Sequence, residues 1–262
     1  MTSVKISLGL GCLAMGRKWG EHSHDIPSNE EAQLLLQTAV DKGISFFDTA
    51  PAYGQSEERL GNFLSSLKNE VRSGLRVATK CGEYWIKENQ STYVDHSFHA
   101  LKESIMQSLG LLGEIDLLQI HKATTASLQR DDIFRAIEFA KNEGIQHFGA
   151  SVSDIETAKM VLHIPEMEFI QFPLNAENKS FEESLKSGIF RENELLINRP
   201  FGMGRLSGFN EANAHIKRVE SFRFILLHKF QGIILTGTSN TSHLLENIKA
   251  FQEALTSVDG SG

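Results

Sequence analysis

Four side chains that can bind or transfer protons lie at the ends of three short apolar stretches of the sequence. Asp48 and Lys80 each end one stretch, His121 ends a third, and Tyr53 lies in the loop after Asp48. A lysine ammonium beside a phenol favours the phenolate and so lowers the pKa of the phenol. A tyrosine tuned in this way can donate or accept a proton near neutral pH, while a histidine hydrogen-bonds the same substrate oxygen. The four residues therefore predict proton transfer to or from a substrate oxygen.

Each of these residues also has a purely structural interpretation when it is considered alone. An aspartate at a strand end commonly forms a turn or a cap, a loop tyrosine commonly packs, and a lone lysine or histidine is commonly solvated or structural. Lys80 is harder to explain in this way because it closes an apolar strand, where an unpaired ammonium is costly to bury. Asp48, at the end of the neighbouring strand, is its natural partner. The joint placement favours a functional site.

These side chains can meet only if the stretches are strands that end on the same side of one sheet. Short apolar runs alternate with amphipathic segments throughout the chain. The runs cover residues 6–12, 45–49, 76–80, 115–121, 147–151, 169–174, 194–200 and 232–238. The amphipathic segments cover 29–42, 56–67, 95–109, 128–142, 154–162 and 179–186, followed by one that ends at 230 and one at 242–255.

The pattern predicts an α/β fold. The runs are continuously apolar, as expected of parallel strands covered on both faces, and the segments after them carry the helical period. Gly43 and Gly144 stand where helices should end. Eight strand–helix units predict a single-domain (β/α)8 TIM barrel over residues 1–262, with a doubly wound open sheet as the alternative. Such a barrel carries its chemistry at the carboxyl ends of its strands.

Composition excludes several other classes of protein. The 262 residues carry 26 basic and 33 acidic side chains, a net charge of −7, so we expect neither a nucleic-acid partner nor a membrane partner. The two cysteines form no CxxC motif, and neither His22 with His24 nor His96 with His99 ends a predicted strand, so we expect no metal site. The run at 6–12 fits a buried strand better than a secretory signal. We therefore expect a cytoplasmic protein.

Three segments resemble the aldo-keto reductase family. They are FFDTAPAYGQSEERLG (46–61), VATK (77–80) and DLLQIH (116–121), and the similarity covers nearly the whole chain. The resemblance implies that Asp48, Tyr53, Lys80 and His121 form the family's catalytic tetrad. It also implies hydride transfer between a nicotinamide cofactor and an aldehyde, a ketone, a sugar-like carbonyl or an alcohol. Tyr53 would be the general acid in reduction, tuned by Lys80, with His121 orienting the carbonyl.

The resemblance places the cofactor on the loops after the last two strands, 199–208 and 236–247. The implied cofactor-binding residues are Ser151, Gln171, Arg199, Pro200, Gly202, Gly204, Leu206, Gly237, Thr238, Ser239, His243, Glu246 and Asn247. Glycines let backbone N–H groups approach a phosphate, and the start of the last helix favours an anion. NADP(H) is the expected cofactor because it dominates the family, with NAD(H) as the alternative.

Three departures from the family pattern affect this cofactor site. Val152 replaces a common Asn, and Leu174 replaces a Tyr that often stacks on the nicotinamide. His243 stands in place of a more basic phosphate partner. The resemblance further implies a monomer that acts on a small-molecule substrate.

The walls of the substrate pocket are less clear from the sequence. Trp19, Tyr84 and Trp85 are candidates for these walls, with core packing as the alternative. Because the loop after the fourth strand is short and no long segment follows Leu255, we expect an open pocket.

Three competing interpretations remain at this point. GLGCLA (9–14) has the form of a dinucleotide fingerprint, but the acidic residues about 20 positions on, Glu30 and Glu31, lie at the start of a predicted helix and not at the end of a strand, so we reject a Rossmann site. Lys80 could instead form a Schiff base in a lyase, but this leaves Tyr53 and the two glycine-containing loops without roles. The third interpretation is a cofactor-binding regulatory or interaction subunit with little turnover, which the changes at Val152 and Leu174 would suit.

Overall fold

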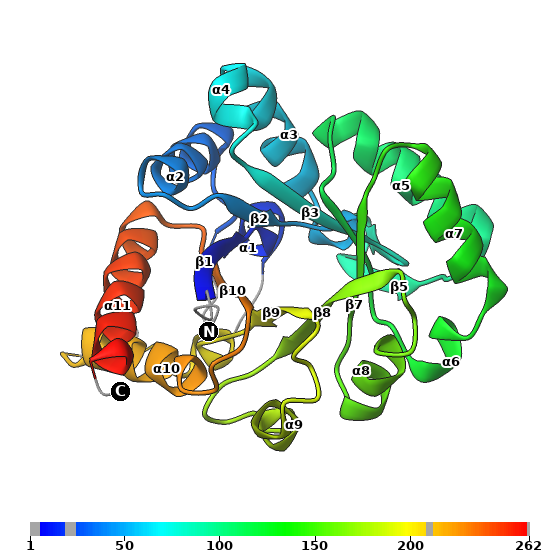
Figure 1. Cartoon of the computed structure of the whole chain (residues 1–262). Helices are drawn as coiled ribbons and strands as arrows, with labels where there is room; N and C mark the ends of the chain where they lie inside the picture. Colours follow the sequence, from blue (N-terminus) through cyan, green and yellow to red (C-terminus); the bar gives the residue numbers. More distant parts are fainter. Residues whose placement is uncertain (1–5, 19–24, 208–211, 261–262) are drawn as a thin grey trace.

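The computed structural model describes residues 6–18, 25–207 and 212–260. In these residues, parallel strands close into a barrel in the order β1-β10-β9-β8-β7-β6-β3-β2 (Figure 1). The strands are β1 (Ile6–Gly11), β2 (Phe46–Asp48), β3 (Arg76–Cys81), β6 (Leu117–Ile120), β7 (His147–Ser151), β8 (Met167–Pro173), β9 (Glu194–Asn198) and β10 (Gly232–Gly237). Closure between β1 and β10 confirms the (β/α)8 prediction and excludes the open sheet.

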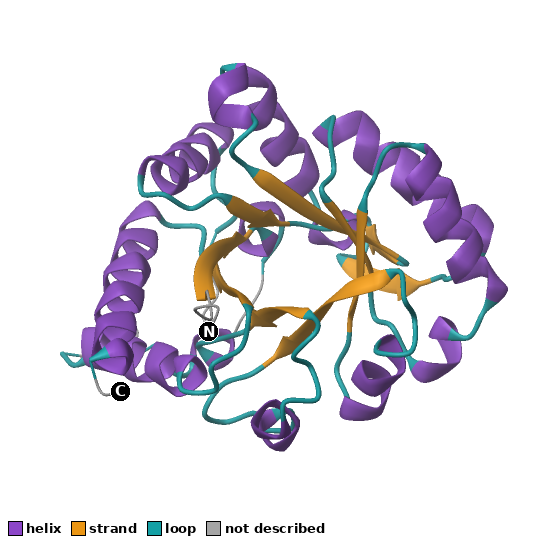
Figure 2. Cartoon of the chain, viewed as in Figure 1, coloured by secondary structure: helices purple, strands orange, loops and turns teal. Residues whose placement is uncertain are grey.

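Helices surround this ring of strands (Figure 2). They are α1 (Leu13–Gly16), α2 (Asn29–Asp41), α3 (Ser56–Ser66), α4 (Asn69–Arg72), α5 (Phe98–Leu112), α6 (Thr125–Leu128), α7 (Asp131–Asn142), α8 (Ile155–Val161), α9 (Glu182–Ser187), α10 (Ala214–Leu226) and α11 (Thr241–Asp259), with 3-10 turns η1 (Pro51–Tyr53) and η2 (Gly202–Gly204). The predicted segment 128–142 corresponds to α7 and shares only its first residue with α6.

Local chemistry sets the ends of the helices, and the two predicted glycine ends are among them. Ser28 and Glu31 form a reciprocal capping box at the start of α2. Gly43 and Gly144 follow α2 and α7 with φ values of 84° and 95°. Residues that carry a side chain rarely adopt these positive, left-handed φ values, so glycine suits the chain reversal at both positions.

The core has two layers, as a barrel covered by helices requires. Large apolar side chains fill the space between the strands and the outer helices. A smaller cluster fills the barrel interior and comprises Phe46, Ala78, Leu117, Phe169, Leu196, Ile233 and Leu235. The strands are therefore apolar on both faces, which explains the continuous apolar runs in the sequence. The polar side chains at the strand ends are therefore exceptions in an otherwise apolar barrel.

A short antiparallel hairpin is the main element that the sequence analysis missed. Its strands, β4 (Glu83–Ile86) and β5 (Ser91–Val94), form a separate two-stranded sheet between β3 and α5. The turn lies at residues 87–90, where Gln90 has a φ of 53°. Two β-favouring stretches, EYWI and STYV, on either side of a polar KENQ turn could have indicated it.

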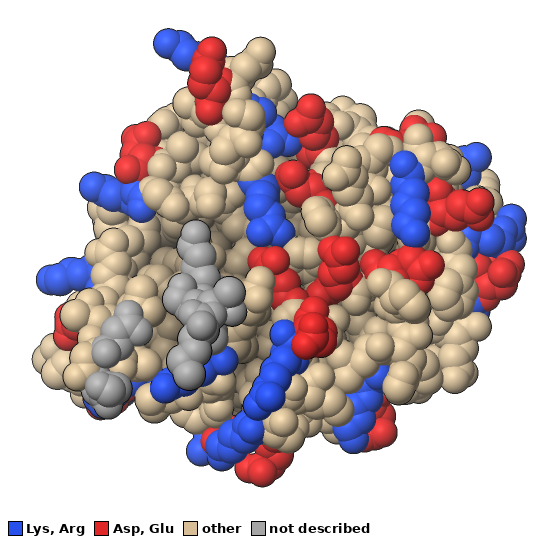
Figure 3. Space-filling view, viewed as in Figure 1, with Lys and Arg blue, Asp and Glu red and all other residues tan. Residues whose placement is uncertain are grey.

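The outer surface is mixed in charge. On the face shown in Figure 3, acidic and basic side chains are interspersed, with no broad region of one sign. Among the described residues, none of the helices has the length and apolar character that a membrane span needs.

Candidate active site

Asp48 and Lys80 form a buried ion pair at the carboxyl ends of β2 and β3. The Lys80 Nζ lies 2.7 Å from each carboxylate oxygen of Asp48 and donates to the carbonyl oxygen of Thr49 at 2.9 Å. Gln119 donates to Asp48 Oδ1 at 3.0 Å. Burial lowers the pKa of Lys80, but Asp48 and Tyr53 outweigh this and leave it above its ordinary value. The partner expected for Lys80 is therefore present, and the lysine is held as a cation.

Tyr53 lies directly beside this ion pair, at the end of η1. The Lys80 Nζ is 4.9 Å from the centroid of the Tyr53 ring. Burial raises the pKa of the Tyr53 phenol and the Lys80 ammonium lowers it. The effect of burial is the larger, so the pKa of Tyr53 lies above its ordinary value. The expected influence of Lys80 has the predicted sign but does not dominate. Tyr53 is consequently protonated at neutral pH, which is the state that a proton donor needs.

The Tyr53 loop is fixed in place by a close backbone contact with α1. A Cβ atom added to Gly16 would overlap the carbonyl oxygen of Tyr53. The backbone N–H of Gln55 donates to the Gly16 carbonyl at 3.3 Å. The absence of a side chain at Gly16 therefore allows α1 and η1 to pack directly against each other.

His121 closes the other side of the Tyr53 phenol. The two rings meet edge to face, with centroids 5.8 Å apart. Burial and the nearby Lys80 lower the pKa of His121 well below its ordinary value, so the ring is neutral. Its backbone is held as well, because His96 Nε2 lies 2.8 Å from the His121 carbonyl oxygen. His96 is thus a supporting residue.

A carboxylate that the sequence analysis did not single out contacts this histidine. Glu83, the first residue of β4, places its Oε2 at 3.2 Å from His121 Nε2. Its Oε1 accepts a hydrogen bond from Thr92 Oγ1 at 2.8 Å across the hairpin. Only 5% of Glu83 is exposed. The missed hairpin therefore contributes directly to the site.

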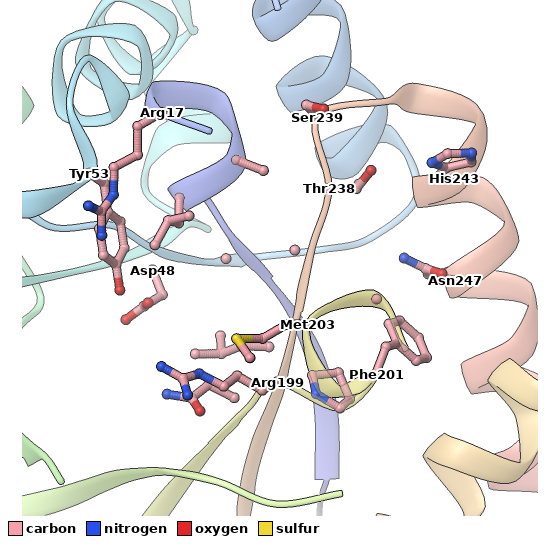
Figure 4. Close-up of a pocket in the computed structure, with 18 of the residues that line it drawn as sticks. Arg17, Asp48, Tyr53, Arg199, Phe201, Met203, Thr238, Ser239, His243 and Asn247 are labelled. Atoms are coloured by element: carbon pink, nitrogen blue, oxygen red, sulfur yellow. The ribbon is translucent and has the colours of Figure 1, made fainter. Parts of the chain in front are cut away.

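These residues open onto one cavity of about 940 Å³ at the mouth of the barrel. Figure 4 shows Arg17, Tyr53 and Asp48 on one side of this pocket, and Thr238, Ser239, His243 and Asn247 on the other. The predicted residues that line it are Asp48, Tyr53, His121, Ser151, Gln171, Arg199, Pro200, Gly204, Gly237, Thr238, Ser239, His243 and Asn247. Lys80 lies beneath the pocket, paired with Asp48.

Three of the predicted cofactor residues are not among the lining residues. Gly202 is buried within η2, and a Cβ atom added to it would lie 3.4 Å from the Leu206 side chain. Leu206 itself is also not part of the lining. Glu246 instead pairs with Arg218, with Nη2 and Oε2 at 3.0 Å. Arg218 of α10 does line the cavity, and the sequence analysis missed this cation because helix position alone does not indicate its direction.

The three residues predicted to form the walls of the substrate pocket are Trp19, Tyr84 and Trp85. Trp19 lies outside the described residues. Tyr84 stacks on Tyr93, with ring centroids 5.1 Å apart, and Trp85 lies under the Arg17 guanidinium at 4.9 Å. Among the described residues, the hairpin lines the cavity through Glu83 and Thr92 rather than through these two aromatic rings.

The two departures near the nicotinamide position are both buried. Leu174 has no exposed surface and belongs to the outer core, and Val152 is 4% exposed at the cavity edge. Met203, from the loop after β9, extends into the pocket (Figure 4). Cys81, whose pKa burial raises to about 12, packs in the core as the sequence interpretation favoured.

A family model described as the Aldo/keto reductase family matches residues 7–223. Since this match spans most of the chain, the protein belongs to that family and is an oxidoreductase. Members of the family in general reduce carbonyl groups with a nicotinamide cofactor.

Individual relatives agree with this assignment. The chain is 27% identical to the uncharacterized oxidoreductase YqkF of Bacillus subtilis, over 93% of this chain and 86% of that protein. It is 34% identical to L-galactose dehydrogenase of Arabidopsis thaliana over 56% of this chain and 44% of that protein. The crystal structure of PA4992, a "putative aldo-keto reductase" from Pseudomonas aeruginosa, superposes with a TM-score of 0.77. That comparison has 27% identity and covers 95% of this chain and 90% of PA4992.

The pocket fits a nicotinamide dinucleotide. Ser151 and Gln171 are paired neighbours at the ends of β7 and β8. The Gln171 Oε1 and Asn198 Oδ1 atoms are buried without a hydrogen-bond partner among the described residues. Buried acceptors in this state suit an amide donor such as the nicotinamide carboxamide. At the far end, Asn240 caps α11 by accepting from the His243 N–H at 3.1 Å, and this helix start suits an anion.

Proposed function

We propose that this protein reduces small aldehydes or ketones, including sugar-like carbonyl compounds, with NADPH, and catalyses the reverse oxidation of the alcohols. The observation that carries the proposal is the Asp48–Lys80 ion pair beside a protonated Tyr53 that faces the large pocket. The names of L-galactose dehydrogenase and D-threo-aldose 1-dehydrogenase among the relatives support sugar-like substrates.

The residues of the chain then have defined roles. The bound nicotinamide supplies the hydride in reduction and accepts it in oxidation. Tyr53 donates its phenolic proton to the carbonyl oxygen, and the Lys80 cation stabilises the phenolate that results. Asp48 keeps Lys80 charged and in place. Neutral His121 donates a hydrogen bond to the same oxygen and orients the carbonyl.

Cofactor binding is assigned to the opposite side of the pocket. Ser151 and Gln171 hold the carboxamide, and the loops 199–206 and 237–247 hold the pyrophosphate and adenosine. NADPH is favoured over NADH because His243 and Arg218 both line the adenosine end. His243→Ala and Arg218→Met should each lower the ratio of NADPH to NADH turnover, and an unchanged ratio in both variants would overturn the assignment of these residues to the 2′-phosphate.

Two alternatives are less well supported. A Schiff-base lyase needs an uncharged lysine nucleophile, whereas Asp48 and Tyr53 raise the pKa of Lys80 above its ordinary value. A cofactor-binding subunit without turnover is not favoured, because all four residues of the tetrad are brought together at the pocket.

The direct test measures oxidation of NADPH, and separately of NADH, by purified protein with a panel of activated aldehydes and diketones. Loss of reduced-nicotinamide absorbance is the expected result. Fluorescence evidence of cofactor binding without turnover of any carbonyl compound would overturn the proposal and favour the regulatory subunit.

A further inference from the structure

Two buried hydroxyl groups join the two ends of the loop that carries Tyr53. Thr49 directly follows β2, Ser56 begins α3, and neither residue has any exposed surface. The Thr49 Oγ1 and Ser56 Oγ atoms lie 2.9 Å apart. Residues 50–55, which include Tyr53, lie between them in the chain. The contact therefore closes the Tyr53 loop at its base.

The direction of this hydrogen bond follows from the other partner of Ser56. The Ser56 hydroxyl donates to the carbonyl oxygen of Cys12 at 2.9 Å. A serine has a single O–H donor, so Ser56 accepts and Thr49 donates. Cys12 directly precedes α1, which also contacts the Tyr53 loop through Gly16. The two hydroxyls thus attach the base of the loop to the same part of the fold that contacts its tip.

Thr49 also holds the Lys80 ammonium. Its carbonyl oxygen accepts a hydrogen bond from Lys80 Nζ at 2.9 Å, and its own N–H donates to the carbonyl oxygen of Ala78 at 2.9 Å. One residue therefore anchors both the cation and the base of the Tyr53 loop. The separation of 4.9 Å between Lys80 Nζ and the Tyr53 ring centroid depends on this shared anchor.

We propose that Thr49 and Ser56 are a pair of positioning residues, whose hydrogen bond holds the Tyr53 phenol at its working distance from Lys80. This inference rests on the proposed reductase function. Neither member of the pair is among the described residues that line the cavity. The pair therefore acts through Tyr53 and Lys80 and not by contact with the substrate.

Several charged or titratable groups surround the Tyr53 phenol. They come from different elements of the fold and are Asp48, Lys80, Glu83, Arg17 and His121. Lys80 has the largest electrostatic effect on Tyr53, and it lowers the pKa of the phenol. Because the attraction between a cation and a phenolate weakens with distance, the pKa of Tyr53 should rise when the pair is broken.

A second contact should keep α3 in place when the pair is broken. Thr79 Oγ1 donates to Glu57 Oε1 at 2.6 Å, and both residues are buried. This hydrogen bond attaches the first turn of α3 to β3 independently of the pair. A variant that lacks the Thr49 hydroxyl should therefore fold, with the base of the Tyr53 loop less firmly held.

The test compares two substitutions of Thr49 with a matched control. Thr49→Val removes the hydroxyl and keeps a branched side chain, whereas Thr49→Ser keeps the hydroxyl. The control is Thr157→Val, because Thr157 is 2% exposed and its Oγ1 donates to Asp154 Oδ2 at 2.8 Å in α8. Steady-state kinetics give kcat and KM for reduction, the pH profile of alcohol oxidation reports the pKa of Tyr53, and thermal unfolding reports stability.

Thr49→Val should lower kcat for reduction by about ten- to a hundredfold, because a small displacement of the donor is costly to catalysis. The KM should change little. The rise of alcohol oxidation with pH should move to higher pH, since the phenolate is less stabilised by Lys80. Thr49→Ser should restore kcat and the pH profile, and Thr157→Val should lower only the stability.

A wild-type kcat and pH profile in Thr49→Val would overturn the proposal. So would equal losses in Thr49→Val and Thr49→Ser, which would assign the effect to packing of the methyl group, or a similar loss of kcat in Thr157→Val. Ser56→Ala removes the same hydrogen bond from the other side and supplies the result if Thr49→Val fails to fold. Failure of the proposed function is distinct, because the wild type then oxidises neither NADPH nor NADH with any carbonyl compound of the panel.

Discussion

The Lys80 ammonium is satisfied by acceptors from a single strand end, because the Asp48 carboxylate contacts it through both oxygens and the next residue, Thr49, through its carbonyl oxygen. A lysine ammonium has three N–H donors, so none has to be met by a substrate. Lys80 therefore acts on Tyr53 through its positive charge while remaining fixed below the pocket.

Replacing Asp48 with Asn should destabilise the fold and reduce activity. The variant leaves a fully buried ammonium without its counterion, which costs about 3–5 kcal/mol in the free energy of unfolding. Urea denaturation measures this change. The control is Lys159→Met, which removes an exposed ion pair to Glu156 and should cost less than about 1 kcal/mol. Equal small effects of the two variants would contradict the structural role of the buried pair.

Replacing Tyr53 with Phe should remove the proton donor while preserving the pocket. We expect kcat to fall by about 10²- to 10⁴-fold, with nearly unchanged cofactor affinity, because the hydroxyl acts on the substrate oxygen. Steady-state kinetics and a cofactor fluorescence titration separate the two effects. A near-normal kcat would show that Tyr53 is not the donor.

The pH dependence of reduction should lack an acidic limb at the ordinary pKa of histidine. The pKa of His121 lies well below 6.5, so the ring stays neutral as the pH falls through that value. The pKa of Tyr53 lies above 10, so the donor proton is retained at neutral pH and is lost only as the pH rises through the raised pKa. We expect kcat/KM for reduction to stay level between pH 6.5 and pH 10. Alcohol oxidation, which needs the phenolate, should increase toward high pH.

Replacing Gln171 with Leu should weaken cofactor binding without destabilising the free protein. The Gln171 Oε1 is buried without a partner among the described residues, so its removal takes away an unsatisfied acceptor. Loss of its bond to the carboxamide should raise the cofactor Kd by about tenfold. A cofactor titration measures the change in Kd, and thermal unfolding measures the stability of the free protein. Gln252→Leu, at an exposed position, is the control. A large fall in Tm with unchanged Kd would assign Gln171 to the core instead.

Replacing Gly16 with Ala should impair catalysis from outside the tetrad. The added Cβ overlaps the Tyr53 carbonyl oxygen, so η1 must shift and carry the phenol with it. We expect kcat to fall together with a loss of stability of about 1–3 kcal/mol. Gly110→Ala is the control, because Gly110 lies in α5 with nothing within 4 Å of an added Cβ. That substitution should stabilise the fold by up to about 1 kcal/mol.

The sequence predicts the parts of the site that depend on strand ends. Asp48, Lys80 and His121 could be placed together because parallel strands of a barrel end at one mouth. Glu83 and Arg218 could not be placed at the site from the sequence. The direction of the Glu83 side chain depends on the hairpin, and the direction of the Arg218 side chain depends on the rotation of α10 about its axis. The same limit applies to the pKa of Tyr53. The residue types indicate the effect of Lys80, whereas the opposing effect of burial depends on the packed structure.

In the part of the chain that the structure describes, the hairpin of β4 and β5 forms its own small sheet and shares no strand pairing with the barrel. It brings a carboxylate to the pocket without carrying any of the tetrad. Because β4 packs against η1 and Glu83 contacts His121, exchange of this segment would alter one wall of the pocket and also two of the supports of the tetrad. A change in the hairpin that keeps the tetrad in place is therefore confined to positions outside these two contacts, such as the exposed turn at residues 87–90.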